Sequence, residues 1–245
     1  MSLKNFTLKA LTAAVILASA SGAVFAKCYK GDFKGEACPP PQILKTGLYL
    51  GGQVGYDSYR VRESIDASSL GFRTNPVLNA NGWVGGLMLG YGMMIYDWVY
   101  LGGEVFGNLS GASQTMSPTR TGSGAVNTDF QVSGSWGVGL LPGIKVTDST
   151  LTYVRLGWNW ANLKQNVNVT DVTGAIVSTG SKSETSNGFV FGVGMETLIV
   201  ENWSLRGEFD HTWYSDFTAL STTLATVTTN PSDNQYMLAL IYHFG

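Results

Sequence analysis

Ten residues near the middle of the chain, Leu151 to Trp160 with the sequence LTYVRLGWNW, have two chemically different faces. Side chains of a β-strand point alternately to opposite sides, so every second residue shares a face. One face is apolar except for its first member: Thr152, Val154, Leu156, Trp158 and Trp160. The other holds small or neutral residues around a single charge: Tyr153, Arg155, Gly157 and Asn159. This strand predicts a narrow barrel with lipid outside and a filled lumen.

Composition agrees with a barrel that crosses a membrane. Only 13% of the 245 residues are charged, 12% are aromatic and 31 are glycine. An ordinary soluble surface has about 25–35% charged residues. No run after the N-terminus reaches the roughly 18 apolar residues that a membrane helix needs. Strands would therefore have to cross, because only helices and closed barrels satisfy their backbone in lipid.

Residues 1–26 have the pattern of a secretory signal peptide. Lys4 and Lys9 form the basic start, Ala10 to Ala20 the apolar centre, and Val24-Phe25-Ala26 the cleavage site. Without this segment the chain has 13 basic and 17 acidic residues, a net charge of −4. That mild acidity provides no basic surface for nucleic acid, so we expect no nucleic-acid partner.

Residues 27–45 are predicted to be a periplasmic arm in front of the barrel. The arm holds both cysteines of the chain, Cys28 and Cys38, and Pro39-Pro40-Pro41 makes it stiff and extended. In an exported chain a disulfide across this short loop is expected, worth about 2–3 kcal/mol. A lipid anchor on Cys28 is the alternative, but Lys27 stands where a small residue should precede a lipidated cysteine.

The alternation of the opening strand recurs along residues 46–245. It predicts an all-β fold, an eight-stranded antiparallel up-and-down transmembrane β-barrel. The expected strands are residues 46–61, 82–94, 99–109, 130–142, 151–160, 188–198, 203–214 and 235–244.

Two kinds of connector alternate between these strands. Three are short, around Tyr96-Asp97, Lys145 to Ser149, and Val200 to Asn202. Four are long and polar and are expected to be loops: Arg62 to Asn79, Gly111 to Asn127, Gln165 to Thr185, and Phe217 to Ser232. Short turns at one rim and long loops at the other are typical of outer-membrane barrels, with the long loops outside the cell. Both termini would then lie in the periplasm.

Several charges fall on the inward face of the expected strands. Glu104, Arg155, Arg206 and Glu208 lie at similar distances from the short-turn end of their strands, and Glu196 can join them from a downward strand. Opposite charges shielded from bulk water predict an interior charge network, in which removal of one member leaves its partner unpaired. The alternative is a set of separate, hydrated side chains.

A soluble lipocalin-like barrel has the same alternation with its apolar face inward. Two features oppose that alternative. The second face is rich in glycine and serine, and Trp83, Trp158, Trp160 and Trp213 cluster toward the long-loop ends of the apolar faces, as in an interfacial girdle.

The last strand, YMLALIYHF, has an apolar or aromatic residue at every second position: Tyr236, Leu238, Leu240, Tyr242 and Phe244. Together with GLYLGGQVGY at 47–56, GLMLGYG at 86–92 and LLPGIKV at 140–146, it resembles the opacity-protein and OmpX-like family of small outer-membrane barrels. The resemblance implies that these five residues are an insertion signal for the barrel insertion machinery of Gram-negative bacteria. It also implies outer-membrane lipid and lipopolysaccharide as surroundings. The family usually ends on the aromatic residue, whereas Gly245 follows Phe244 here.

Signals for catalysis are sparse. His211 and His243 are the only histidines, no G-x-S-x-G or H-E-x-x-H motif occurs, and no helix follows the glycines of 134–139. We therefore expect no catalytic residue, cofactor or metal. A lipid A-modifying enzyme stays an alternative, although Trp213 stands where a deacylase would place a serine two residues after His211.

The resemblance implies adhesion, host interaction or envelope integrity as the function. The connectors are rich in Thr, Ser and Asn, which suits hydrated segments that meet host or cell-surface ligands. A narrow pore or small-molecule transporter is the other alternative, but side chains about fill the interior of an eight-stranded barrel.

Overall fold

The computed structural model describes residues 44, 46–67, 72–121, 124–170, 173, 175–221 and 226–244. The expected signal peptide and the arm with Cys28 and Cys38 lie outside these residues. The described part consists of strands: β1 (Gly47–Ala67), β2 (Phe72–Thr74), β3 (Val77–Tyr96), β4 (Val99–Ser110), β5 (Ser113–Thr121), β6 (Gly124–Thr147), β7 (Thr150–Thr170), β8 (Ile176–Val200), β9 (Trp203–Tyr214), β10 (Phe217–Ser221) and β11 (Thr226–His243). None of its residues belongs to a helix long and apolar enough to cross a membrane.

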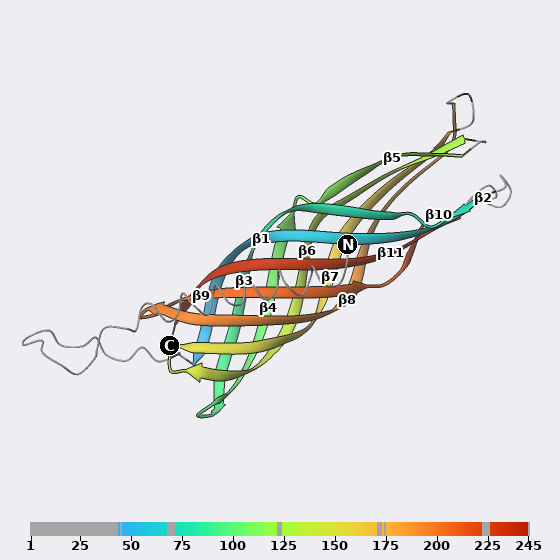
Figure 1. Cartoon of the computed structure of the whole chain (residues 1–245). Coiled ribbons are helices and arrows are strands. Elements are labelled where there is room, and N and C mark those ends of the chain that lie inside the picture. The colour runs from blue at the N-terminus through green and yellow to red at the C-terminus, as the bar shows by residue number, and fades with distance from the viewer. Residues whose placement is uncertain are drawn as a thin grey trace, which may run out of the picture.

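Eight of these strands close into a ring. Antiparallel neighbours follow the order β1, β3, β4, β6, β7, β8, β9, β11, and β11 pairs with β1 to complete the barrel. Figure 1 shows the tilted strands wrapping around a common axis. The predicted eight-stranded antiparallel barrel is confirmed, and each predicted strand lies within one ring strand apart from its terminal residues Thr46 and Phe244.

The short connectors are tight turns at one end of the ring, which we call the turn end. Asp97-Trp98, Asp148-Ser149 and Glu201-Asn202 join their strand pairs there. Glu201 has a φ of 40°, a left-handed conformation that a non-glycine residue adopts only where a tight turn requires it. The predicted positions of these turns are correct.

The prediction of long polar loops at the other end is wrong, because most of those residues are paired strands. β1 continues to Ala67, β7 to Thr170, and β8 already begins at Ile176. Thr and Val favour strands, and the paired strand ladders supply the backbone hydrogen bonds that loops would take from water. β8 has 25 residues, more than twice the roughly 9–11 that a membrane crossing needs.

We call the part beyond the membrane-crossing ring the distal extension; it comprises the described residues within 58–82, 111–134, 161–187 and 214–234. The β8–β9 ladder ends at Gly188 opposite Tyr214, and the β4–β6 ladder ends at Leu109 opposite Gly134. Past these points the wall continues as a β5–β6–β7–β8 sheet and a sheet of β3, β1, β11, β10 and β2, which are still joined where Asn81 of β3 pairs with Ser113 of β5. In Figure 1 these strands continue beyond the barrel as two diverging groups tipped by β5 and β2.

The two parts of the wall have opposite polarity. In the ring, large apolar side chains are exposed on the outside, as lipid requires; Leu87 is 66% and Val54 54% exposed. In the distal extension many apolar side chains point inward instead and form one buried cluster: Tyr59, Val61, Ile65, Leu78, Ala80, Ala112, Phe130, Val132, Ala161, Leu163, Val167, Tyr214, Phe217 and Val227. The extension is therefore built like a two-sheet sandwich in water.

Aromatic side chains mark both edges of the outward apolar band. Trp83, Trp136, Trp158 and Trp213 are exposed near the distal extension, and Tyr96, Trp98, Trp203 and Phe244 are exposed near the turn end. Such paired girdles mark the two membrane interfaces of a transmembrane barrel. The outward apolar band is the arrangement predicted here and the reverse of a lipocalin-like barrel.

Candidate functional site: the filled lumen

The five charged residues that the sequence placed inside the barrel come together in the structure. Glu104 on β4, Arg155 on β7, Glu196 on β8, and Arg206 and Glu208 on β9 point inward and are buried. Arg155 is 2% and Arg206 1% exposed, so neither guanidinium is hydrated from the bulk. Strand alternation puts all five on the lumen side, and the ladder register brings them to one level of the barrel.

Glycines on the facing strands leave room for these long side chains. Gly90 and Gly192 pair directly with Glu104 and Arg155, respectively. A Cβ atom at Gly90 would collide with the Tyr49 ring, and one at Gly192 would collide with the Asp210 carboxylate. These two glycines therefore contribute to the site by leaving the space that the Tyr49 ring and the Asp210 carboxylate occupy.

Glu104 lies between the two arginines and joins them. Its Oε1 accepts a hydrogen bond of 2.6 Å from Nη2 of Arg155, and its Oε2 accepts one from Nη1 of Arg206. Tyr49 Oη donates a further hydrogen bond of 2.9 Å to Oε2. Charge-assisted bonds to both oxygens offset the cost of placing this carboxylate away from water.

Arg206 continues the network toward the turn end. Its Nη2 and Nε donate to Oε2 of Glu196 at 2.8 and 3.0 Å. The other oxygen of Glu196 accepts from Ser204 Oγ at 2.6 Å and lies 2.8 Å from His243 Nε2. The guanidinium of Arg206 is also 5.2 Å from the ring centroids of Tyr49 and Tyr153, within the range of cation–π attraction.

Arg155 continues the network toward the distal extension. Its Nη2 lies 2.8 Å from Oε1 of Glu208, whose other oxygen accepts a hydrogen bond from Tyr153 Oη. Its Nε lies 3.7 Å from Oδ1 of Asp210, and its guanidinium lies 5.0 Å from the Phe106 ring centroid. Hydrogen bonds therefore connect the lumen network from His243 to Glu208, and a longer ion pair extends it to Asp210.

Sequence reasoning missed several members of this network: Tyr49, Tyr153, Ser204, Asp210 and His243. All five share the inward parity of the predicted members, which was the available signal. Parity alone could not separate a network member from a side chain that only fills space, because partner distances depend on the tilt and stagger of the strands.

A second polar layer lies between the network and the apolar core of the distal extension. Gln53 Nε2 donates to Asn108 Oδ1 at 2.6 Å, and Asp57 accepts from Ser110 Oγ and Gln235 Nε2, both at 2.6 Å. These hydrogen bonds link the side chains of β1, β4 and β11 across the lumen, while Nδ2 of Asn108 is buried without a partner.

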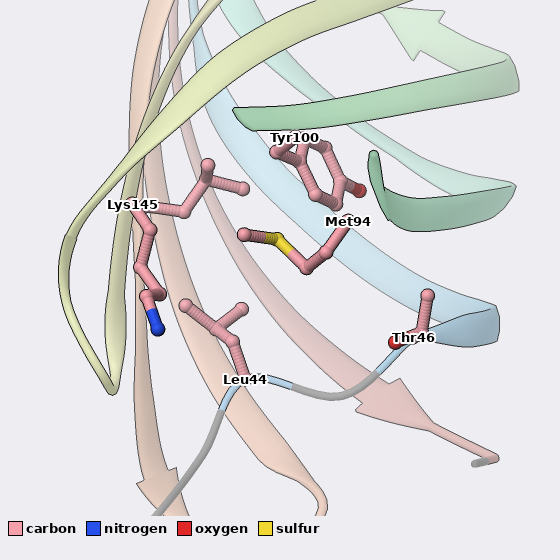
Figure 2. A pocket seen from close by; sticks show the side chains of 6 residues that line it. Leu44, Thr46, Met94, Tyr100 and Lys145 are labelled. Atoms are coloured by element: carbon pink, nitrogen blue, oxygen red, sulfur yellow. The ribbon is translucent and has the colours of Figure 1, made fainter. Parts of the chain in front are cut away.

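Side chains also close the lumen at the turn end. Leu44, just before β1, folds under the barrel and its N–H donates 2.9 Å to the carbonyl of Asp148. Its side chain belongs to a buried cluster with Tyr100, Leu141, Leu151 and Tyr153. Figure 2 shows Leu44, Met94 and Tyr100 converging there around a small cavity of about 10 Å³. One water molecule needs about that volume, so the described turn-end cavity holds no passage.

The histidines do not form a hydrolytic arrangement with their described neighbours. His243 Nε2 lies near both Ser204 Oγ (3.0 Å) and Glu196 Oε1 (2.8 Å), so the carboxylate and the hydroxyl meet the same ring nitrogen. A catalytic triad needs them on opposite nitrogens and an accessible serine, whereas Ser204 is fully buried. His211 faces outward, with Nδ1 2.8 Å from Asn234 Oδ1 and its ring against Trp213.

The five residues of the expected insertion signal lie on the outward face of β11 and the residue after it. Leu238, Leu240 and Phe244 are exposed, and Tyr236 and Tyr242 are partly exposed. The Tyr242 ring packs edge-on against both Trp203 and Phe244, with centroids 5.1 Å apart in each pair. The aromatic end of the signal therefore lies in the turn-end girdle.

Comparison with known proteins gives consistent results. The family described as outer membrane protein beta-barrel domain matches residues 10–244. The 31 kDa outer-membrane immunogenic protein of Brucella melitensis is 27% identical over 183 residues, which cover 72% of this chain and 74% of that protein.

Two solved structures of outer-membrane proteins are similar to this chain at low sequence identity. The attachment invasion locus protein Ail of Yersinia pestis is 14% identical, with a TM-score of 0.36 over 79% of this chain and 99% of that one. The outer membrane protease OmpT of Escherichia coli is 11% identical, with a TM-score of 0.49 over 81% and 97%.

Proposed function

Because this chain belongs to the outer membrane protein beta-barrel family, we propose that it is a non-enzymatic surface protein whose distal extension makes adhesive contacts outside the cell. The observation that carries the proposal is the extension itself. Its strands continue beyond the membrane band and enclose their own apolar core, so it holds a defined surface away from the lipid. A rigid scaffold that presents a polar face is typical of binding surfaces.

The outer face of the extension on β7 and β8 is a regular array of amides and hydroxyls. Thr185, Ser181 and Thr179 on β8 donate hydrogen bonds of 2.8, 2.7 and 2.8 Å to the side-chain oxygens of Asn162, Asn166 and Asn168 on β7. These bonds hold each asparagine in place and leave its NH₂ group directed away from that bond. Preordered donors lose little entropy on binding a hydrated polar partner, such as a cell-surface glycan or protein.

The lumen supports a structural role more than transport or catalysis. The network between His243 and Asp210 lies between two apolar clusters, the one around Leu44 and the one in the distal extension. The two apolar clusters oppose the narrow-pore alternative, because an ion that crossed the barrel would have to displace their packed side chains. The shared nitrogen of His243 and the burial of Ser204 oppose the enzyme alternative.

The proposal is tested by binding of whole cells to host matrix and epithelial cells. We expect cells with the protein to bind more than cells without it, and Asn166→Asp/Asn168→Asp to lower binding. This change removes two NH₂ donors while the new carboxylates still accept from Thr179 and Ser181. Asn79→Asp/Asn81→Asp on the other sheet adds the same charge and is the control.

The comparison of cells with and without the protein tests the adhesive function, and the comparison of the two double variants tests the position of the binding site. Equal binding with and without the protein would overturn the adhesive function. Equal binding of both double variants would keep the function and move its site off the β7–β8 face.

A further inference from the structure

Three polar side chains lie together inside the apolar core of the distal extension. Glu63 on β1, Gln165 on β7 and Thr229 on β11 point inward, and each is at most 2% exposed. Val61 and Ile65, the inward neighbours of Glu63 along β1, belong to the apolar core. Polar groups in such surroundings depend on one another for hydrogen bonds, because bulk water does not reach them. We call these three residues the core polar cluster.

The core polar cluster connects the two sheets of the extension. Thr229 Oγ1 donates a hydrogen bond of 3.0 Å to Gln165 Oε1, and Gln165 Nε2 donates one of 2.6 Å to Glu63 Oε1. Glu63 and Thr229 are ladder partners in the sheet that contains β1 and β11, whereas Gln165 belongs to the β5–β6–β7–β8 sheet. The Gln165 amide therefore holds the two sheets together through their common core.

Glu63 lies where a negative charge would be poorly compensated. Its Oε2 is buried without a partner among the described residues. A neutral carboxyl group loses one hydrogen bond at this oxygen, whereas a carboxylate places a full charge there without water. Burial therefore raises the pKa of Glu63 to about 7, although the hydrogen bond from Gln165 lowers it.

The described charges on the surrounding strands do not supply the missing partner. The described inward side chains of β3, β6, β7 and β10 in the extension carry no ionisable group. Lys182 and Glu184 face the core from β8 but pair with each other at 2.6 Å, and Arg73 of β2 pairs with Asp66 at 2.7 Å. The other inward ionisable groups near the core are acidic: Asp57 and Tyr59 on β1, Tyr214 on β9 and Asp233 on β11. An ionised Glu63 therefore has to be solvated by water.

The two edges of this sandwich are joined unequally. At the β8–β10 edge, Lys182 Nζ donates a hydrogen bond of 3.1 Å to the Thr218 carbonyl and lies 5.9 Å from the Phe217 ring centroid. At the β3–β5 edge, the described ladder pairing is limited to Asn81 opposite Ser113. Figure 1 shows the tips of β5 and β2 lying apart. The β3–β5 edge is therefore the side on which the two sheets can separate.

We propose that Glu63 is a pH-sensitive switch of the distal extension: its protonated side chain keeps the two sheets packed, and its ionised side chain admits water and lets them separate at the β3–β5 edge. Water that solvates Oε2 also reaches the apolar side chains beside it, so the packing of the core weakens. Gln165 directly precedes Asn166 of the adhesive face, so the switch also sets how firmly that face is held. This last consequence rests on the proposed function, whereas the movement of the sheets does not.

The test is a spin-label distance measurement on the full-length barrel in lipid nanodiscs. Asn79→Cys and Thr115→Cys place labels on β3 and β5, across the edge that should open, in a Cys28→Ser/Cys38→Ser background. We expect the distance to lengthen by about 5 Å, the spacing of one strand, between pH 5.5 and pH 8.5. The midpoint should lie at about pH 7. Glu63→Gln should keep the pH 5.5 distance at both pH values, because a neutral amide replaces the carboxyl group.

Three controls accompany this measurement. Labels at Ser183→Cys and Thr218→Cys, across the β8–β10 edge, should keep their distance at both pH values. Asp129→Asn removes an outward carboxylate of β6 and should leave the movement unchanged. An Asn79–Thr115 distance that does not change with pH would overturn the switch, as would the same lengthening in Glu63→Gln. Equal lengthening at both edges would overturn the proposed opening at the β3–β5 edge. Heat-modifiable gel mobility shows that each variant is folded, and adhesion does not enter any of these readouts.

Discussion

At the scale of single residues, the lumen shows why charges can be buried in a membrane barrel. Glu104 receives hydrogen bonds from two arginines and a tyrosine, and Glu196 receives them from Arg206 and Ser204. Each bond offsets desolvation only while its partner is present, so the stability of the network depends on its completeness.

We predict that Arg155→Met and Glu104→Gln each destabilise the barrel by about 3–5 kcal/mol, because each leaves a buried partner without its counter-charge. The double variant should lose much less than the sum, since the two residues share one ion pair. Unfolding by urea in lipid or detergent measures all three. Small, additive losses would mean a hydrated lumen and would support the narrow pore.

Glu63 is a buried carboxyl group in the distal extension, beyond the membrane band. Burial raises the pKa of Glu63 to about 7, although Gln165 Nε2 donates to it at 2.6 Å. Between pH 4.5 and 7 the folded state then binds more protons than the unfolded state, so stability falls as pH rises, by up to about 1.4 kcal/mol per unit.

We predict that Glu63→Gln removes this pH dependence. The urea midpoint of the wild type should fall from pH 5 to pH 8, whereas that of the variant should change less over the same range. Asp129→Gln, an outward substitution on β6, is the control and should follow the wild type. A wild-type midpoint that is flat or rises with pH would contradict the role of Glu63.

At the scale of secondary-structure elements, each long strand has two different environments along its length. β1 carries Val54 outward to lipid and Val61 inward to the extension core, and the parity of its apolar residues changes between them. Such a strand can pair in one register only, because a slip of one residue would reverse both halves. β11 carries the insertion signal at the turn end and the extension core at the other.

For β11 we predict that Phe244→Ala lowers the amount of protein in the outer membrane more than Tyr236→Ala does. Phe244 ends the expected insertion signal and packs on Tyr242 in the turn-end girdle. Tyr236 lies at the opposite interface. Heat-modifiable protein in outer-membrane fractions is the measurement, and equal levels for Phe244→Ala and wild type would remove the terminal aromatic from the signal.

At the scale of the whole molecule, the barrel is one continuous wall with a lipid-facing ring and a sandwich-like extension. Among the described residues, only the extension projects far beyond the membrane band, because the three turns at the other end are two residues long. The orientation of the molecule therefore decides which compartment the extension meets.

We predict that the extension is outside the cell. Epitope tags inserted at Gly122, between β5 and β6, or at Gly174, between β7 and β8, should bind antibody on intact cells. A tag at Asp97, in the turn between β3 and β4, should be reached only after permeabilisation. Labelling at Asp97 in intact cells would reverse the orientation and the proposed function with it.

The arm before the barrel is predicted to fold independently of it. The double variant Cys28→Ser/Cys38→Ser should therefore keep the heat-modifiable mobility of the wild-type barrel. Loss of the mobility shift in this variant would make the arm part of the barrel fold.

The sequence by itself determined the ring and the inward position of its charges. Alternation in segments such as 151–160 specifies which side chains share a face, and in lipid each backbone group must pair, so eight such segments leave a closed barrel as the stable arrangement. Arg155 and Glu104 could be assigned to the lumen for this reason, before any distance was known.

Only the tertiary structure showed that the strands continue into the extension and which side chains contact one another within the lumen. Residues 165–185 look polar because their outward Asn, Ser and Thr dominate the composition, while the inward Val167 joins a core whose other members come from distant strands. His243 and Asp210 likewise became network members through the stagger of the ring, which sets distances between residues far apart in the chain. Alternation is a local property of a strand, whereas register and closure depend on all eight strands together.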